Sequence, residues 1–389
     1  MKVNKIIVSM LITVIVFSTG FWFGKLKAAE DLESRLEVFL QVLSLVKNQY
    51  VDKNLDNSKL VYGAVKGLLS SLDDPYTRFL EPQAYSEMRV RLKGTYSGIG
   101  IYIGMKENQL TVISPIPGTP AAKEGLKAKD KILSIDGTNT KDMALEQAVS
   151  MIRGKRGTKV KLSITRFGFK EPKDFVVARE KIEIKSTEYK VVNDNLAYIK
   201  LNTFEKQSAP AELKDAILKA KNKRLQGLIL DLRGNGGGLL DNAIQIGSMF
   251  IRSGAIVQTI DRDGAREVKY STGGVIWTAP TVVLIDESSA SASEILAGAL
   301  QDNKIATIVG TRSFGKASVQ SVRVMQDDSA VLLTIAKYLT PNGSDITKKG
   351  IQPDIVITAP THEAQAQLLE QSGRDIQLEK AVEVLRSKI

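Results

Sequence analysis

The chain has 389 residues, 43% of them hydrophobic and 25% charged, which suits two or three folded domains and excludes a disordered or collagen-like protein. Lys and Arg exceed Asp and Glu by 54 to 43, but the basic residues are spread along the chain without a nucleic-acid-binding motif, so we expect no nucleic-acid partner. Cysteine is absent and the single histidine, His362, lies in a polar stretch, which excludes thiol catalysis and argues against a histidine triad or metal site.

The N-terminus carries an uncharged stretch, residues 6–24, between Lys5 and Lys25. Its length is close to the roughly 20 apolar residues that cross a bilayer as a helix. We therefore expect residues 1–28 to be an uncleaved membrane anchor. A cleaved signal peptide is the alternative, because Ala28 and Ala29 could lie near a cleavage site.

Apolar residues recur at steps of three and four from about Ala29 to Gln83, which predicts helices. The first stripe consists of Leu32, Leu36, Phe39, Leu40, Leu43 and Val46. A second helical stretch, 58–72, stops at Asp-Asp-Pro-Tyr-Thr (73–77). We assign residues 29–90 to a helical segment whose stripe is either ordinary core or a dimer contact.

From about residue 94 to 167 the pattern changes to strands and turns. Strands are expected at 98–101, 112–115, 130–137 and 159–166, with a turn at 117–122 and an amphipathic helix at 143–152. This order, with the Ala-Ala-x-x-Gly-Leu turn and the Asp-Lys-Ile-Leu-Ser-Ile-Asp-Gly strand, resembles a PDZ domain, which we place at residues 91–170.

The PDZ resemblance implies a peptide-binding site at Gly98, Ile99, Gly100 and Ile101. PDZ domains hold a peptide's C-terminal carboxylate on backbone N–H groups at this position, and the peptide adds a strand to the sheet edge. Arg153 is our candidate for sensing that ligand. Its alternative is a solvated arginine in a basic turn.

An α/β pattern occupies residues 171–358, and a polar helical tail follows at 359–389. Apolar strands are expected at 196–201, 227–233 and 281–285, with helices at 209–221 and 292–301. The glycine run 234–238 lacks both the Walker pattern and the dinucleotide spacing, which argues against a nucleotide-binding enzyme.

The serine-rich segment 286–295 lies where a buried strand meets a helix. Small residues permit a sharp turn that exposes a hydroxyl, and the free N–H groups of the helix N-terminus suit a developing oxyanion. The alternative is that these serines are only N-caps.

Without a usable histidine, a serine could still be activated by a neutral lysine whose pKa is depressed by burial. If 317–324 is a strand, Lys316, Ser318 and Gln320 project to one side. Gln320 could then orient the lysine without adding a carboxylate. The alternative for Lys316 is a surface lysine in a glycine-rich turn.

Three motifs together, at 289–295, 314–320 and 231–238, resemble the C-terminal processing peptidases, the Tsp-like Ser-Lys proteases that carry a PDZ domain. The stretches 73–77 and 349–354 also fit. The resemblance implies Ser291 as nucleophile, because the family's serine-to-lysine spacing is met there. It further implies Lys316 as general base, Gln320 as its orienting partner, and an oxyanion hole from the N–H groups of Ala292 and Gly237.

Two positions depart from the family pattern: Ala317 stands where glycine is usual, and Asp286 where asparagine is common. Neither removes a catalytic group, although the methyl group of Ala317 could alter how the Lys316 loop reaches its active position.

The expected protein is a multidomain α/β enzyme: membrane-anchor helix, helical segment, PDZ-like domain, Ser-Lys protease core and C-terminal helix. The resemblance implies a serine endopeptidase that needs no metal or cofactor and acts on proteins outside the bacterial cytoplasm through their C-termini. It would be a homodimer anchored in the cell membrane, or secreted if the N-terminal segment is cleaved. The alternative is an inactive anchored PDZ scaffold that binds C-termini.

Overall fold

The computed structural model describes residues 33–106, 109–183, 185–357 and 374–389. The chain divides after Leu68 into two compact units. The expected membrane segment, 6–24, and His362 lie outside the described residues. Within the described ranges, no helix combines the length and apolarity needed to cross a membrane.

The first unit is helical, as the apolar periodicity predicts. Residues 33–49 form one helix. The second helix, α2 (Asn57–Ser70), extends two residues past the unit boundary at Leu68. Three residues of the predicted stripe, Leu36, Phe39 and Leu40, have 52%, 46% and 59% of their surface accessible, and Leu43 and Val46 are half-buried. The stripe is therefore not core within the described single chain.

The first strand of the second unit lies in a stretch where the apolar pattern predicted helix. The Asp74 carboxylate accepts hydrogen bonds from Tyr76 N (3.0 Å) and Thr77 Oγ1 (2.7 Å). These bonds stabilise a turn around Pro75. Strand β1 (Arg78–Leu80) then pairs antiparallel with β18. Helix α3 (Pro82–Lys93) follows, and Gly94, with φ of +64°, ends it.

The module expected to be PDZ-like is an antiparallel sheet with two short helices. Its elements are β3 (Ile101–Lys106), β4 (Gln109–Pro115), β5 (Lys131–Ile135), β6 (Thr138–Asn139), β7 (Lys159–Thr165), β8 (Lys173–Ala178), α4 (Pro120–Lys123) and α5 (Leu145–Ile152). Because β8 pairs with β7, this sheet continues to Ala178, past the boundary expected at residue 170. A separate two-stranded ribbon joins it to the core: β2 (Thr95–Gly98) and β9 (Glu180–Glu183).

The α/β core is built on a six-stranded sheet that is parallel except for its first strand. In spatial order the strands are β10 (Thr187–Val192), β11 (Leu196–Leu201), β12 (Gly227–Asp231), β15 (Thr281–Ile285), β16 (Ala306–Gly310) and β19 (Ile355–Val356). All side chains of β12 and β15 are buried, as expected for strands covered on both faces.

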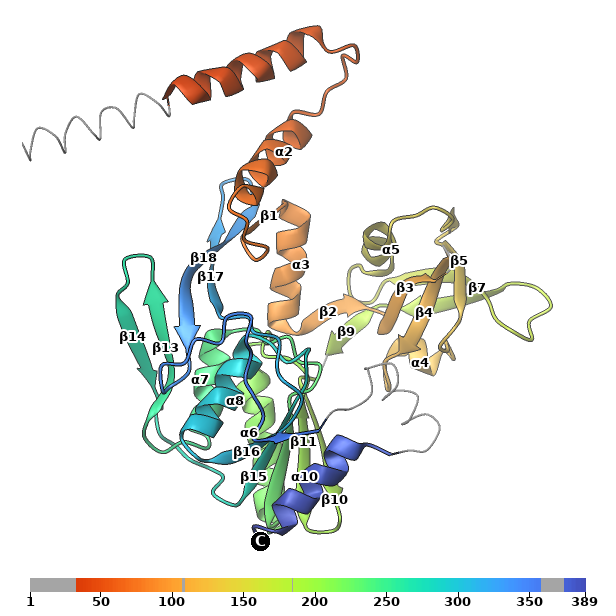
Figure 1. The fold of residues 1–389 in the computed structure, drawn as a ribbon. Coiled ribbons are helices and arrows are strands. Elements are labelled where there is room, and N and C mark those ends of the chain that lie inside the picture. The colour runs from red at the N-terminus through yellow and green to blue at the C-terminus, as the bar shows by residue number, and fades with distance from the viewer. Residues whose placement is uncertain (1–32, 107–108, 184, 358–373) are drawn as a thin grey trace, which may run out of the picture. The chain divides into compact units, whose positions relative to one another are not determined.

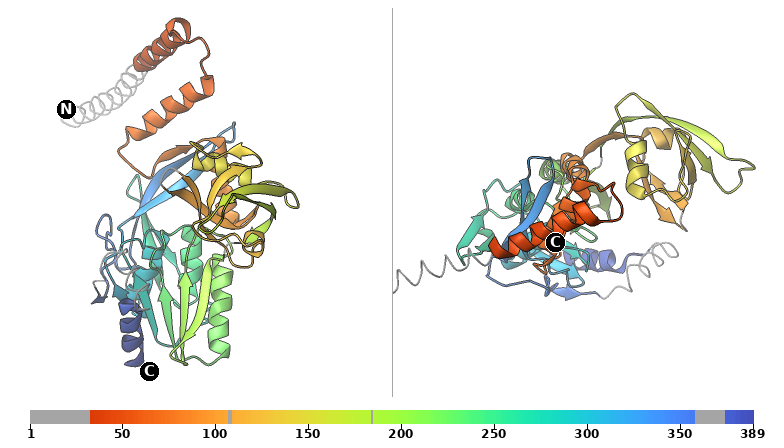
Figure 2. Two further views of the ribbon diagram at one scale, coloured as in Figure 1. Left: turned by 90° about the vertical axis from the view of Figure 1, so that its right-hand side faces the viewer. Right: turned by 90° about the horizontal axis from the view of Figure 1, so that it is seen from above.

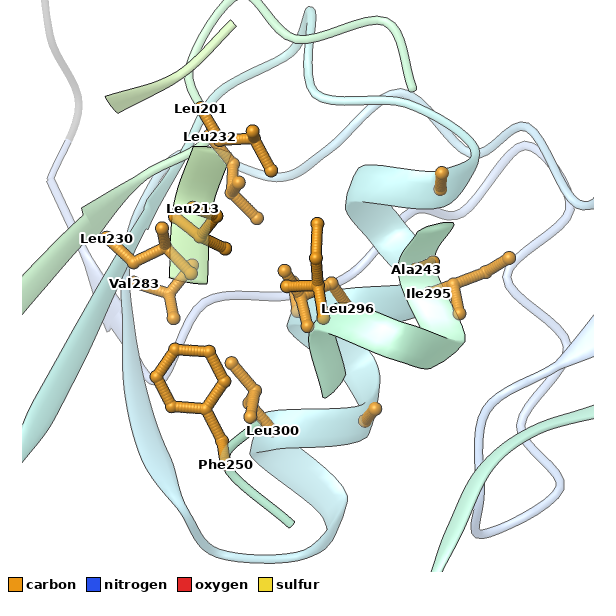
Figure 3. Close-up of a cluster of buried hydrophobic side chains, with 14 of the residues drawn as sticks. Leu201, Leu213, Leu230, Leu232, Ala243, Phe250, Val283, Ile295, Leu296 and Leu300 are labelled. Atoms are coloured by element: carbon orange, nitrogen blue, oxygen red, sulfur yellow. The ribbon is translucent and has the colours of Figure 1, made fainter. Parts of the chain in front are cut away.

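Helices cover both faces of this sheet (Figures 1 and 2). One face carries α6 (Ala209–Asn222), α7 (Leu240–Ser248) and α8 (Ala292–Asp302), and the other carries α10 (Ile376–Arg386). Figure 3 shows how Leu230 and Val283 of the sheet face Leu296 and Leu300 of α8. This packing fixes α8, and with it the turn that precedes the helix.

A second sheet lies beside the core and is centred on β18 (Ala330–Leu339). One edge of β18 pairs with β17 (Ser318–Val324), and the other with β1 and β13 (Ala255–Asp261), which in turn pairs with β14 (Arg266–Tyr270). The register of β17 and β18 shifts because Ile335 is an extra residue in β18. The alternation of side chains along β17 is therefore preserved.

A buried ion pair ties α10 to the sheet. The Asp231 carboxylate accepts from Tyr198 Oη at 2.7 Å and pairs with Arg233 Nη2 at 2.6 Å. Arg233 also pairs with Asp375 at 2.8 Å and donates to Gln377 Oε1 at 3.1 Å. Asp375 caps α10, so the guanidinium joins the end of β12 to the start of the last helix.

We expect Arg233→Met to lower the free energy of unfolding by about 3–5 kcal/mol, because it leaves the buried Asp231 carboxylate without its cation. Urea denaturation measures the change. Arg374→Ala is the matched control: its pair with Glu379 is exposed and screened by solvent, so its loss should leave the free energy of unfolding nearly unchanged. Equal effects of the two substitutions would contradict the assigned role of Arg233.

Candidate active site

A cavity of about 370 Å³ lies where the core and the β18 sheet meet. It is lined by the turn before β1, helix α3, the glycine run, the start of α8 and the β17–β18 hairpin. Ser291, Lys316 and Gln320 all face it, with Tyr76 and Gly238. The structure thus brings the three expected catalytic side chains to one cavity.

Ser291 occupies a strained turn between β15 and α8. Its φ of +56° and ψ of −116° are rare for a residue with a side chain. The flanking Ser289 and Ser293 are fully buried, and their hydroxyls donate to the carbonyls of Leu232 (2.9 Å) and Asn235 (2.8 Å). Of these three serines, only Ser291 lines the cavity.

The glycine run reaches the serine turn through Asn235 and Gly237. Asn235 is fully buried, and its side chain donates to Leu201 O at 2.7 Å and accepts from Gly237 N at 2.9 Å. A side chain on Gly237 would lie 2.5 Å from Ala290 O and 2.8 Å from Ala292 N, and its φ is +94°. Only glycine fits this close approach.

The backbone N–H groups of Gly238 and Ala292 also lie near Ser291, and they differ from that of Gly237 in their hydrogen bonding. The bridge between Phe204 and Gly238 uses Gly237 O and Leu239 N, so the N–H of Gly238 points away from Phe204. Ala292 is the first residue of α8, where an N–H has no acceptor within its own helix. Gly237 differs, because its N–H is engaged by Asn235.

Asp286 joins the same two loops. Its carboxylate accepts from Gly234 N and Ser288 N, both at 3.0 Å. Both partners are backbone donors, which suits a carboxylate. The departure from asparagine therefore keeps a structural acceptor at this position.

Lys316 directly precedes β17, and its ammonium lies over the Tyr76 ring, 4.5 Å from the centroid. In the described part of the chain no hydrogen bond joins Lys316 Nζ to Ser291 or Gln320, and Gln320 Nε2 donates to Ser318 Oγ at 2.9 Å. Burial lowers the pKa of Lys316, with help from the nearby Arg78 charge. The carboxylates of Asp74, Glu205 and Glu294 act in the opposite direction.

Glu294 connects the Ser291 turn to the Lys316 loop. Its carboxylate is 1% exposed and accepts from Ser291 N (2.8 Å) and Lys316 N (2.9 Å). It also accepts from Gly315 N and Ser313 Oγ, both at 2.6 Å. Burial raises the pKa of Glu294, while these hydrogen bonds favour its charged form.

Glu294 was not among the functional residues expected from the sequence. The available signal was the Ser-x-x-Glu spacing from Ser291, which is typical of a helix capping box. That pattern predicts the bond from Ser291 N to Glu294, but not the partners in the loop at 313–316.

Tyr338 supports the same two loops from β18. It is 2% exposed, and its hydroxyl lies within hydrogen-bond distance of the carbonyls of Ser291 (3.1 Å) and Lys316. Its backbone N donates to Ala317 O at 3.0 Å. Ala317 is buried in the core cluster, so its methyl group packs against apolar side chains and does not face the cavity.

The stretch 349–354 holds the Lys316 loop from outside. Ser313 N donates to Ile351 O at 3.1 Å, and Ile351 N donates to Ser313 Oγ at 2.6 Å. Gly350, with φ of +67°, lies so close that a side chain would be 2.2 Å from Ser313 O. This explains why glycine is needed in that motif.

The expected peptide-binding residues form a turn between β2 and β3. Ile99 O accepts from Ala121 N, and Gly100 O from Ile116 N, both at 2.9 Å, so the turn is fixed against α4 and its preceding loop. Gly98 to Ile101 are thus not one continuous strand, because Gly100 has φ of +81°. Arg153 follows α5, and its guanidinium lies 5.0 Å from the Tyr96 ring centroid.

No set of acidic or histidine side chains suited to a metal ion occurs among the residues that the structure describes.

Comparison with known families divides the chain into three matched regions. Residues 195–357 match peptidase family S41, residues 88–165 match the PDZ domain, and residues 24–84 match the N-terminal domain of the activating protease CtpB. These regions agree with the order of the structural elements described above.

Curated relatives align over most of the chain. A carboxy-terminal-processing protease of Bartonella bacilliformis is 40% identical over 339 residues, covering 86% of this chain and 77% of the relative. The protease CtpA of Bacillus subtilis is 35% identical over 357 residues, covering 92% and 76%. Among solved structures, a photosystem II D1 C-terminal processing protease is 31% identical with a TM-score of 0.51, covering 86% of this chain and 91% of that chain.

Replacing Glu294 by glutamine should reduce kcat/KM by about a hundredfold, because the amide group presents donors to N–H groups that need an acceptor and displaces both loops. The assay is cleavage of an unfolded protein, with circular dichroism to confirm folding. Glu287→Gln, an exposed neighbour in the same turn, is the control and should keep full activity. A folded Glu294→Gln variant with unchanged kcat/KM would refute this positioning role.

Proposed function

This chain belongs to the carboxy-terminal processing proteases of peptidase family S41, and on that premise we propose that Ser291 and Lys316 are its catalytic dyad. The observation that carries the proposal is that both side chains line one cavity while their backbone N–H groups share the buried Glu294 carboxylate. A single buried group thus sets the separation of nucleophile and base.

The proposed reaction is acyl transfer. Ser291 Oγ attacks the scissile carbonyl carbon while the neutral Lys316 amine takes the hydroxyl proton. The resulting ammonium gives that proton to the leaving amine, which departs as the new N-terminus. Water then attacks the acyl ester, Lys316 again accepts the proton, and Ser291 is regenerated with release of the new C-terminus.

Backbone N–H groups would stabilise the oxyanion that forms during attack. Ala292 remains our first donor because its N–H starts α8. For the second donor, the hydrogen bond from Gly237 N to Asn235 favours Gly238 over the originally expected Gly237 in this conformation. Gly238, unlike Gly237, lines the cavity.

Lys316 suits the role of base because burial lowers its pKa and enlarges the neutral fraction at a given pH. Gln320 would orient the amine through its side-chain carbonyl, since its amide group donates to Ser318. Gln320 brings no negative charge that would keep the lysine protonated.

Substrates would be proteins outside the cytoplasm whose free C-termini bind the PDZ module. The turn from Gly98 to Ile101 would hold the terminal carboxylate on its backbone N–H groups, with Arg153 nearby as a sensor. Ligand binding there would favour the aligned state of the dyad.

Residues 6–24 would anchor the chain in the bacterial cell membrane, on the strength of their length and lack of charge. The exposed stripe at Leu36, Phe39 and Leu40 supports a homodimer, because unpaired apolar helix faces are costly in water. The alternative of an inactive PDZ scaffold is not favoured by the family or by the shared cavity.

Ser291→Ala and Lys316→Ala should each reduce cleavage of an unfolded protein with an apolar C-terminus by at least about a thousandfold. Lys316→Arg should be equally inactive, because arginine stays charged. Lys337→Ala, an exposed lysine of β18, is the control. Cleavage that survives Ser291→Ala would mean a different nucleophile, and wild-type peptide binding without any cleavage would establish the scaffold.

The same assay across pH should show kcat/KM rising as Lys316 loses its proton and levelling off above its pKa. Because that pKa lies below the ordinary lysine value, the plateau should be reached at a lower pH than for a solvated lysine. A pH-independent rate would argue against lysine as the base.

Peptides with a free C-terminus should bind about ten- to a hundredfold more tightly than their C-terminal amides, because amidation removes a charged acceptor. Calorimetry measures both affinities. Arg153→Ala should reduce this ratio, whereas Arg156→Ala, an exposed neighbour, should not. An unchanged ratio in Arg153→Ala would remove Arg153 from the site.

A further inference from the structure

The turn at 73–77 supplies none of the proposed catalytic residues, yet one of its side chains, Tyr76, contacts Lys316. Tyr76 lines the cavity, and its ring centroid lies 4.5 Å from Lys316 Nζ. This distance is within the range at which an ammonium is attracted to the face of an aromatic ring. The contact joins a residue before β1 to a residue more than two hundred positions later.

Several hydrogen bonds fix the turn in place. Asp74 accepts from Tyr76 N at 3.0 Å and from Thr77 Oγ1 at 2.7 Å. The Thr77 hydroxyl oxygen accepts in turn from Thr334 N of β18 at 3.0 Å. The pairing of β1 with β18 continues this attachment. The ring is therefore held by the same strand that supports the Lys316 loop.

An aromatic face discriminates between the two forms of the lysine. It attracts the ammonium through the ring quadrupole, and it offers a neutral amine little in return. While Lys316 lies on the ring, its protonated form is thus favoured, and that form cannot accept the Ser291 proton. The absence of any hydrogen bond from Lys316 Nζ to Ser291 Oγ in the described residues agrees with a resting arrangement.

We propose that the Tyr76 ring is a resting seat for the Lys316 ammonium, which the side chain must leave before its amine can serve Ser291. This inference rests on the proposed role of Lys316 as base. Tyr76 is accordingly a positioning residue, since it acts on the reaction only through Lys316.

Other charged groups near Lys316 act on the same equilibrium and must be kept constant. Burial and the Arg78 guanidinium favour the neutral amine. Three carboxylates favour the ammonium, namely Asp74 of the turn, Glu205 before α6 and Glu294 of α8. Arg91 of α3 pairs with Glu205 at 3.6 Å and reduces its effect. Burial and the carboxylates of Asp74 and Glu294 raise the pKa of Tyr76, so its phenol stays neutral.

The test is the pKa of Lys316 itself, measured on the full-length chain by competitive acetylation across pH and mass spectrometry of the Lys316 peptide. Performing it in the Ser291→Ala background makes the readout independent of catalysis. Tyr76→Leu and Tyr76→Met remove the aromatic face while keeping an apolar side chain. Tyr76→Phe keeps the face and removes only the hydroxyl.

We expect both ring-free variants to lower the pKa of Lys316 by about one unit, and Tyr76→Phe to stay near the wild-type value. With Ser291 intact, the rise of kcat/KM with pH should move by the same amount, so activity below the pKa should increase up to about tenfold. A merely structural role for Tyr76 would lower activity at all pH values without moving the profile.

An unchanged acetylation pKa in folded Tyr76→Leu and Tyr76→Met would overturn the seat. So would a shift of the same size in Tyr76→Phe, because the hydroxyl rather than the ring would then be responsible. If acetylation shifts as expected while the wild type cleaves nothing, the seat stands and the proposed function fails. The two hypotheses are thus separated by one set of proteins.

Discussion

The candidate site depends on one buried carboxylate. Glu294 lies at the third position of α8, where the helix N-terminus stabilises negative charge, and four of its hydrogen-bond donors come from two separate loops. Burying a carboxylate is costly unless its oxygens are satisfied, so each donor becomes a constraint on the backbone that carries it. The positions of Ser291 and Lys316 are therefore coupled through their backbone N–H groups. These bonds do not restrict the rotamers of the two side chains.

The glycine run is coupled to the serine turn by a second set of contacts. The Asp286 carboxylate accepts from backbone N–H groups of both loops, and the backbone carbonyl of Asn235 accepts from Ala290 N in the serine turn. The close approach at Gly237 leaves no room for a side chain. The N–H groups that surround Ser291 are consequently held by buried polar side chains. A backbone fixed in this way suits acyl transfer, because the neighbouring N–H groups that stay free need not move as charge develops.

Much of this arrangement could be predicted from the sequence because it depends on local patterns. The strands 196–201 and 281–285 and the turn before α8 follow from continuous apolar runs next to small residues, and the structure has both strands at those bounds. Strand β1 was missed because it is short and is stabilised by pairing with β18, some 250 residues later. Tyr338 and Tyr76 were also missed as site residues, because only tertiary structure brings them to Ser291 and Lys316. Periodicity carries no information about such contacts.

The ion pair between Arg233 and Asp375 has a consequence for the time course of synthesis. Arg233 stands directly before the glycine run, whereas its partner Asp375 at the start of α10 lies 142 residues later and is made after the strands of the central sheet. Until α10 docks, the Asp231–Arg233 pair lacks its second carboxylate and one face of the central sheet stays open to water. A nascent chain therefore carries Ser291, Lys316 and Gln320 before the sheet beneath them is covered on both faces.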